Sequence, residues 1–410
     1  MKMRTGLNGL AFLAAASVIL SSAATAQDPP RFKQDRFAIG FWVDPPEVTD
    51  ERYAEIAEAN FTLVLGGFGS TSPDVVTKQI ELCNKYDLKL LAWPGNGEAS
   101  ELQQGAPVWG YLVRDEPNVS DFPALRARVD AIHAARPGAL AYINLFPNYA
   151  SEKQLGTATY EEHVQRFIDE VRPDVLSMDH YPIFKPESDG RDGYCATLGV
   201  MREYSLKAGI PFWNFFNIMP YGPHTDPTEA QVRWQVYTSL AYGAKGVLYF
   251  CYWTPRGDEF PKGGAIIGVD GKRTRHYDEA KRVNKAVKNL GPTLMSLTST
   301  SVVRVAPGAD AKTALAGSPL RDLIPASVDP PNDYLAGIYR HSDGRRAVLL
   351  VNYRYALSAW PTVEFDAPLD QVVEVSQETG AEVPVHDASL DMAGTQVSLD
   401  AGSGRLFLMP

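Results

Sequence analysis

The feature that most constrains the fold is a regular alternation of short β-rich runs with amphipathic helical stretches, from residue 37 to about residue 290. Strands and helices that alternate in this way form parallel sheets with right-handed crossover connections. Eight β-rich runs match a closed (β/α)8 barrel, because an open doubly wound sheet usually has about five or six strands. The sequence therefore predicts an α/β fold built on a TIM barrel. The predicted strands are 37–43, 61–67, 89–93, 108–114, 139–145, 175–179, 212–217 and 246–253.

The segments between these runs have helical periodicity. The first predicted strand leads into Asp44-Pro45-Pro46 and not into a Gly-x-Gly-x-x-Gly turn, so the sequence does not predict a dinucleotide site. The glycines at 66, 67 and 69 are typical of a tight turn, and we expect no nucleotide cofactor. The predicted helices are 51–59, 74–86, 122–135, 160–171, 194–208, 229–242 and 278–290.

After residue 290 the pattern changes to short β-rich segments. An Asp343-Gly344 pair predicts a hairpin turn between two of them. We therefore predict a small all-β sandwich over 296–410, after a catalytic barrel over 27–295. A polar, Pro-rich stretch at 306–333 is interpreted as a surface loop. The β-rich segments are 301–305, 334–340, 346–352, 362–365, 371–375 and 405–409.

The first 26 residues have the three parts of a secretory signal. Lys2 and Arg4 precede an apolar run at 9–20, and small residues end at Ala26. This run is shorter than the roughly 20 residues of a membrane span. We expect cleavage near Ala26 and export to the periplasm or the medium, without a stable membrane anchor.

Charge and residue spacing exclude several classes of function. The formal net charge is −10, and nucleic-acid binding needs a basic surface, so we expect no nucleic-acid partner. Three cysteines provide no disulfide framework. The seven histidines lack metal-ligand spacing, so the sequence predicts neither a metal nor another cofactor.

Polar and aromatic residues follow most of the predicted barrel strands. The active site of such a barrel is built at the carboxyl ends of its strands. Aromatic rings there stack on sugar faces, and amides and carboxylates pair with sugar hydroxyls, so we expect a carbohydrate ligand. The predicted substrate-binding residues are Asp44, Trp93, Arg114, Asp115, Asn144, His180, Tyr181, Asn214, Asn217 and Trp253.

Two segments resemble a known family. The segment 109–117, which ends in Arg114-Asp115-Glu116-Pro117, resembles strand four of clan A barrel glycoside hydrolases, where Asn-Glu-Pro or Asp-Glu-Pro carries the catalytic acid. The segment 240–253 is similar to the last helix and strand of β-galactosidase-like barrels. The resemblance covers most of 37–290. It implies a hydrolase of polysaccharides or oligosaccharides in which Glu116 protonates the leaving oxygen.

The chain departs from that family at the end of strand seven, where retaining clan A enzymes carry a nucleophilic glutamate. The run 212–217 has no carboxylate. We therefore predict Asp179 as the second catalytic residue, with Glu259 and Asp115 as weaker candidates. Carboxyls about 6.5–9.5 Å apart would invert the anomeric centre and carboxyls about 5–5.5 Å apart would retain it; we favour inversion.

Other interpretations remain open. Asp115 could be a structural residue that orients Arg114, and His180 could be a satisfied structural histidine. The missing strand-seven carboxylate also suits a barrel that binds carbohydrate without cleaving it. A polysaccharide lyase or a transglycosylase is a further alternative. The sequence predicts neither the sugar nor the oligomeric state.

Overall fold

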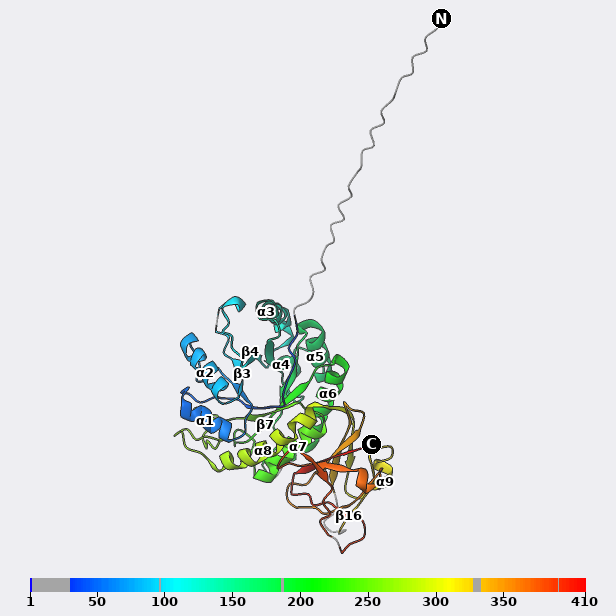
Figure 1. The fold of residues 1–410 in the computed structure, drawn as a ribbon. Helices are drawn as coiled ribbons and strands as arrows, with labels where there is room; N and C mark the ends of the chain where they lie inside the picture. The colour runs from blue at the N-terminus through cyan, green and yellow to red at the C-terminus, as the bar shows by residue number, and fades with distance from the viewer. Residues whose placement is uncertain (2–29, 96, 186–187, 327–332, 390) are drawn as a thin grey trace.

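The computed structural model describes residue 1 and residues 30–95, 97–185, 188–326, 333–389 and 391–410. Apart from Met1, the predicted signal sequence lies outside these residues. Within the described ranges, no helix has both the length and the apolar character needed to cross a bilayer. Figure 1 shows a helix-wrapped barrel with a smaller β domain, orange to red, on one side of it.

The barrel strands form two four-stranded parallel sheets that join at both edges. Between β1 and β2, the backbone N–H of Thr62 donates to the carbonyl oxygen of Ile39 at 2.9 Å. Between β5 and β6, the N–H of Leu145 donates to the carbonyl oxygen of Ser177 at 2.8 Å. The barrel is therefore closed, and the predicted α/β fold class is confirmed. The strands are β1 Ala38–Phe41, β2 Leu63–Leu65, β3 Lys89–Ala92, β4 Val108–Asp115, β5 Leu140–Asn144, β6 Leu176–Asp179, β7 Phe212–Asn217 and β8 Gly246–Phe250.

Helices surround the barrel (Figure 1), and side-chain caps fix several of their first turns. The Thr49 hydroxyl accepts a hydrogen bond from the N–H of Arg52, and Thr228 and Gln231 form a capping box before α7. Such caps satisfy N–H groups that have no partner within the helix. The helices are α1 Asp50–Glu58, α2 Pro73–Lys85, α3 Phe122–Ala135, α4 Glu152–Leu155, α5 Tyr160–Arg166 with a π-helical turn at Phe167–Val171, α6 Arg191–Ala208, α7 Glu229–Ala241 and α8 Arg275–Met295.

Aromatic rings fill the barrel interior toward the amino ends of the strands. The ring centroid of Trp213 lies 6.1 Å from that of Trp109 and 5.7 Å from that of Tyr142. Phe32, which precedes β1, packs edge-on against Trp109. All four rings are buried. This end of the barrel is therefore a packed core, as expected for the face that contributes stability.

Two antiparallel sheets form the C-terminal β domain. Phe365 of the three-stranded sheet packs edge-on against Phe407 of the six-stranded sheet, at 5.2 Å between centroids, in a shared core. This arrangement is the predicted sandwich. The turn at Asp343-Gly344 joins two of its strands, with Gly344 at φ 96°. The strands are β9 Leu297–Val305, β10 Leu320–Ile324, β11 Tyr334–His341, β12 Arg346–Asn352, β13 Thr362–Phe365, β14 Val373–Val375, β15 Glu382–Pro384, β16 Thr395–Gln396 and β17 Gly404–Met409.

The predicted surface loop at 306–333 is partly wrong, because it contains the short helix α9 (Ala311–Ala314) and the strand β10. A register shift against β13 lies between Leu320 and Asp322. As a result Leu320 and Leu323, three residues apart, are both buried in the core of the sandwich. A bulge of this kind interrupts the strict alternation by which strands are identified in a sequence.

The second face of the six-stranded sheet packs against the barrel. Gly337 of β11 lies directly against the carbonyl oxygen of Ala241, where a Cβ atom would collide. The Tyr339 hydroxyl donates to the carbonyl oxygen of Leu240. Leu349 and Leu406 extend the hydrophobic core of the barrel into the sheet. The β domain and the barrel therefore share one core across α7.

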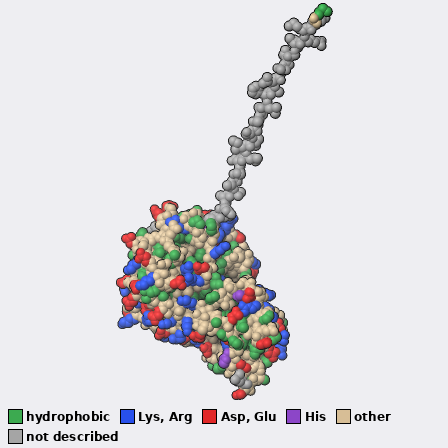
Figure 2. Space-filling view, in the orientation of Figure 1, with side chains coloured by type: hydrophobic (Ala, Val, Ile, Leu, Met, Phe, Trp, Pro, Cys, Tyr) green, Lys and Arg blue, Asp and Glu red, His purple; other side chains and the backbone are tan. Residues whose placement is uncertain are grey.

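Charged side chains of both signs are interspersed over the face of the molecule shown in Figure 2. Elsewhere in the described structure, oppositely charged side chains form surface ion pairs, such as Arg345 with Glu382 at 2.8 Å. Pairs of this kind contribute little to stability, about 0–1 kcal/mol each. On this face, the negative net charge is not gathered into one patch.

Candidate active site

A cavity of about 190 Å³ lies at the carboxyl ends of the barrel strands. Four carboxyl groups and one amide contribute its polar lining, and aromatic rings contribute the remainder. The polar residues are Asp115, Glu116, Asn144, Asp179 and Glu259. The aromatic residues are Trp42, Tyr181, Phe215, Tyr221, Phe250 and Phe260.

The end of β4 brings two consecutive carboxyls to this cavity. The pairing of β4 with β5 shifts register between Leu112 and Arg114, and Asp115 then pairs with Asn144. Glu116 has a left-handed backbone, at φ 47°, and its N–H donates to the carbonyl oxygen of Asn144 at 2.9 Å. Adjacent side chains of a regular strand point to opposite faces. The left-handed turn therefore lets Asp115 and Glu116 line the same cavity.

Burial and a neighbouring negative charge alter the acidity of Glu116. Burial raises the pKa of the Glu116 carboxyl to about 7, and the charge of Asp115 adds to that rise. Within the described residues, the carboxyl accepts no side-chain hydrogen bond that would favour its ionised form. A carboxylic acid with a pKa near neutrality is suited to general acid catalysis.

Asn144 links the other two buried carboxyls. Its Nδ2 group donates to Oδ1 of Asp179 at 2.9 Å and to Oδ1 of Asp115 at 3.2 Å. The Ser177 hydroxyl donates to Oδ1 of Asn144 at 3.0 Å, which fixes the direction of the amide. Burial, followed by the charges of Glu116 and Asp115, raises the pKa of Asp179 well above its ordinary value. The three carboxyls therefore form one electrostatic group that retains protons near neutral pH.

The structure brings Glu116 and Asp179 together with Asp115, Asn144 and Tyr181, all of which were predicted as site residues. The predicted role of Asp115 in orienting Arg114 is not observed. Instead, the Arg114 guanidinium turns outward and pairs with Asp121 at 3.4 Å. Arg114 does not line the cavity.

Asp44, predicted to bind substrate, holds a loop instead. Its carboxylate accepts hydrogen bonds from the N–H groups of Phe68 and Gly69 at 2.8 and 2.9 Å, and from the side chain of Gln79 at 3.2 Å. Burial raises the pKa of Asp44 to about 7, although these hydrogen bonds oppose the rise. Asp44 therefore fixes the turn between β2 and α2.

Other predicted substrate-binding residues also lie outside the cavity lining. Nδ1 of His180 lies 2.9 Å from the Thr197 hydroxyl on α6, and burial lowers the pKa of His180 to about 3. The Asn214 amide donates to the hydroxyls of Tyr194 and Ser239 behind the barrel wall. These side chains point outward because they alternate with the inward-facing residues of their strands. The cavity lining also lacks three other predicted substrate-binding residues, Asn217, Trp93 and Trp253. The Arg52 guanidinium lies 5.1 Å from the centre of the Trp253 ring.

Several cavity residues are not among the predicted site residues. Tyr221 and Phe260 lie in loops after β7 and β8, where the sequence offers no periodicity that would indicate their orientation. The buried Tyr221 hydroxyl has no hydrogen-bond partner within the described structure. Trp42 and Phe250 do follow the inward alternation of β1 and β8, and that signal could have identified them.

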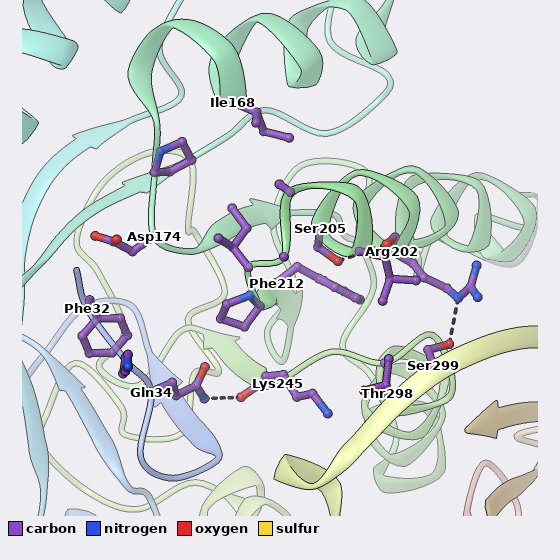
Figure 3. Close-up of a pocket in the computed structure, with 18 of the residues that line it drawn as sticks. Phe32, Gln34, Ile168, Asp174, Arg202, Ser205, Phe212, Lys245, Thr298 and Ser299 are labelled. Carbon is purple, nitrogen blue, oxygen red and sulfur yellow. Dashed lines mark hydrogen bonds between the residues drawn. The ribbon is translucent and has the colours of Figure 1, made fainter. Parts of the chain in front are cut away.

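A larger cavity, about 860 Å³, lies at the opposite face, near the amino ends of the strands (Figure 3). Its polar groups are held by structural contacts, such as the Gln34 amide with the Lys245 carbonyl oxygen at 2.7 Å and Arg202 with the Ser299 hydroxyl at 2.8 Å. Barrel enzymes build their active sites at the carboxyl ends of their strands. We therefore assign the catalytic site to the smaller cavity.

No cluster of metal-ligating side chains is present in the described ranges. In particular, no group of three or more His, Cys, Asp or Glu side chains there has a geometry that could hold a metal ion. Two of the cavity-lining carboxyls, those of Asp115 and Asp179, instead accept hydrogen bonds from the Asn144 amide.

The fold is similar to solved structures of glycoside hydrolases. A β-galactosidase from Bacillus circulans sp. alkalophilus gives a TM-score of 0.56 at 11% identity, over 92% of this chain and 99% of that one. A catalytic mutant of a GH42 β-galactosidase from G. stearothermophilus gives 0.57 at 9% identity, over 93% and 100%. A β-galactosidase from Marinomonas ef1 gives 0.46 at 12% identity, over 62% of this chain and 60% of its own. No protein-family model and no curated protein sequence matches the chain.

The first two similarities extend over nearly the whole of this chain, through the barrel and the β domain. They agree with the resemblance that the Asp-Glu-Pro segment and the last barrel strand predict. Identities this low establish the fold alone. The chain therefore has the fold of the β-galactosidase-like barrel glycoside hydrolases.

Proposed function

We propose that this protein is a glycoside hydrolase. The observation that carries the proposal is the placement of Glu116, with a raised pKa, beside Asp179 in an aromatic-lined cavity at the carboxyl ends of the strands. Two carboxyls of different environment across one small cavity are the groups that glycosidic cleavage requires. The substrate is a polysaccharide or an oligosaccharide.

Glu116 acts as the general acid. The Asn144 amide donates to Asp179 and Asp115 and favours their ionised forms, whereas Glu116 has no such donor. With a pKa raised to about 7, Glu116 carries a proton below that pH and transfers it to the leaving glycosidic oxygen as the bond breaks. The ring of Trp42 provides an apolar wall for the sugar.

Asp179 is the second carboxylate. As its conjugate base it removes a proton from the attacking water, and the anomeric configuration is inverted. Glu259 also lines the cavity and is the alternative base. The configuration of the first product, followed by proton NMR, tests inversion directly, and a product of retained configuration would assign Asp179 the role of nucleophile.

Replacement of Glu116 by Gln tests the central claim. The amide keeps the size of the side chain but provides no transferable proton, so turnover of glycosides should fall by about 10²–10⁴-fold. The measurement is release of reducing sugar from a panel of polysaccharides and aryl glycosides. Asp258→Asn is the control, because this exposed neighbour of Glu259 does not line the cavity. Equal turnover by the wild type and Glu116→Gln would contradict the proposal.

A barrel that binds carbohydrate without cleaving it is the second candidate. The observation that favours it is that Phe215 lines the cavity from β7, and that this strand carries no carboxylate. This function predicts saturable sugar binding and no turnover on any substrate of the panel. Turnover that is lost in the Glu116→Gln variant would exclude it.

We also propose that the mature protein is exported after cleavage near Ala26. The basic, apolar and small-residue segments at 2–26 support this proposal. N-terminal sequencing of protein recovered outside the cytoplasm should begin at Gln27. Recovery of the chain with Met1 still attached would contradict it.

A further inference from the structure

The cavity is lined by more carboxyl groups than the hydrolysis of a glycosidic bond requires. Two carboxyls suffice for the reaction, yet Asp115 and Glu259 also line the cavity beside Glu116 and Asp179. Among the described residues of the lining, none is Lys, Arg or His. The Arg114 guanidinium, whose charge acts on Asp115, is directed to Asp121 on the outside. Although the coupled carboxyls retain part of their protons near neutral pH, a bound ligand would therefore meet negative charge that no cation of the described lining offsets.

The protein also provides few hydrogen-bond donors for these carboxyls. The Asn144 amide has two protons, and it donates to Asp179 and Asp115. The other donors of the described lining are the Trp42 indole N–H and the phenols of Tyr181 and Tyr221. Burial raises the pKa of both phenols, so they remain protonated. These five donor protons cannot satisfy the eight oxygen atoms of four carboxyls. The remaining acceptors are open to donors from the ligand.

The arrangement excludes an anionic sugar. A uronic acid or a sulfated sugar would bring a further negative charge into a half-enclosed cavity without a cation to pair with it, which is strongly unfavourable. A neutral sugar would provide hydroxyl donors but would not offset the charge. An ammonium group provides three donors and a positive charge at one point.

We propose that the sugar ring bound in this cavity carries a protonated amino group, so that the substrate is a glycan of amino sugars with free amines. The cleavage of such a glycan rests on the proposed function, whereas the preference for binding an amino sugar does not. Asp115 and Glu259 are the residues that receive the ammonium, and Glu116 and Asp179 remain available for the chemistry. An N-acetylated amine lacks the charge and is not selected.

The expected preference is about tenfold. A charge-assisted hydrogen bond in a partly buried site favours the amine, and a tenfold change in Kd corresponds to about 1.4 kcal/mol. Matched probes are glucosamine, glucose, N-acetylglucosamine and glucuronic acid, together with the same four forms in the galactose series. Titration followed by ligand-observed NMR near neutral pH gives their relative affinities. In at least one series the amine should bind about tenfold more tightly than the neutral sugar, and the uronic acid should not bind.

Two variants assign the preference to the proposed residues. Asp115→Asn and Glu259→Gln each remove one cavity charge, whereas Asp258→Asn removes one charge just outside it. Glu259 is exposed, so its replacement should not disturb folding even if that of Asp115 does. Loss of the amine preference in either cavity variant, but not in Asp258→Asn, supports the proposal.

Two results would overturn it. One is equal or weaker binding of both amines relative to their neutral sugars, and the other is an amine preference that survives in both cavity variants. Turnover is measured separately. Absence of hydrolysis with the amine preference intact would refute the proposed hydrolase but not this inference. Hydrolysis of neutral glycans without an amine preference would refute this inference but not the proposed hydrolase.

Discussion

Asp115 contributes to the raised pKa of Glu116. Burial is the larger cause of the raised Glu116 pKa, and the negative charge of Asp115 is the second. Because the two residues are adjacent in the chain, their separation is fixed by the left-handed turn at Glu116. A neutral residue at 115 would keep the burial and remove the charge.

Asp115→Asn should therefore lower the Glu116 pKa from about 7 toward its ordinary value. A general acid is active below its pKa, so activity on the alkaline side declines as the pH rises through that value. In the variant this decline should begin at a lower pH. The profile of kcat/KM against pH measures the change, and an alkaline limb that does not move would show that Asp115 does not act on the proton of Glu116.

At this scale the sequence predicted the residue types better than their orientation. Glu116 and Asp179 were identified from a motif and from strand-end positions, and both line the cavity. His180 and Asn214 also occupy strand-end positions but face the surrounding helices. Which strand-end side chains line the cavity depends on where each strand ends and on the register shift near Val113. Neither can be read from a short segment of sequence.

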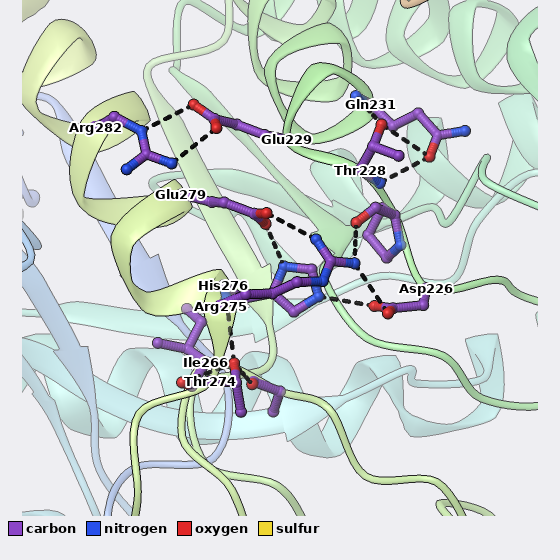
Figure 4. A network of polar contacts seen from close by, with 12 residues as sticks. Asp226, Thr228, Glu229, Gln231, Ile266, Thr274, Arg275, His276, Glu279 and Arg282 are labelled. Atoms are coloured by element: carbon purple, nitrogen blue, oxygen red, sulfur yellow. Dashed lines mark hydrogen bonds and ion pairs between the residues drawn. The ribbon is translucent and has the colours of Figure 1, made fainter.

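The elements that follow β7 and β8 are joined by a buried histidine at the start of α8 (Figure 4). His276 contacts Asp226, in the segment before α7, at 2.8 Å, and Glu279 of α8 at 2.6 Å. Arg275 pairs with the same two carboxylates. Burial alone would lower the His276 pKa, but the hydrogen bonds to Asp226 and Glu279 raise it. The network ties together the loops that bear Tyr221 and Glu259.

This network predicts a stability that depends on pH. A histidine whose pKa is raised in the folded state stabilises the fold fully below its unfolded pKa, about 6.5, and loses that contribution as the pH rises through the folded value. His276→Gln should therefore cost roughly 1–2 kcal/mol near pH 6 and less at alkaline pH. Thermal unfolding of both proteins across this range measures the difference, and a cost that is independent of pH would refute the role of the charge.

Among the elements, long periodic helices were predicted closely and short strands less so. The helix at 122–135 begins and ends as predicted, because its apolar spacing and its flanking residues agree. The strand predicted at 61–67 is reduced to Leu63–Leu65, since only these residues pair with β3. Pairing with a distant strand, and not local composition, decides such ends.

At the scale of the whole molecule, the contact of Gly337 with the Ala241 carbonyl sets how closely the β domain approaches α7. Gly337→Ala should separate the two elements and destabilise the protein by about 1–3 kcal/mol. Gly199→Ala on α6 is the matched control, since its new Cβ would lie 3.9 Å from the nearest atom, on Tyr242. The control should be neutral or slightly stabilising. Unfolding in urea compares them, and equal stability of the two variants would contradict this account.

The change of pattern near residue 290 predicted two domains but not their shared core. That core depends on contacts between residues about a hundred positions apart, such as the hydrogen bond from the Tyr339 hydroxyl to the Leu240 carbonyl oxygen. That shared core limits how the molecule can be rearranged. Recombination could not simply replace the β domain by an unrelated domain. The replacement would need a strand with a glycine that fits against the end of α7. Insertions and deletions in this lineage should accumulate in the barrel loops, and the junction between α7 and β11 should change only by paired substitutions on both sides.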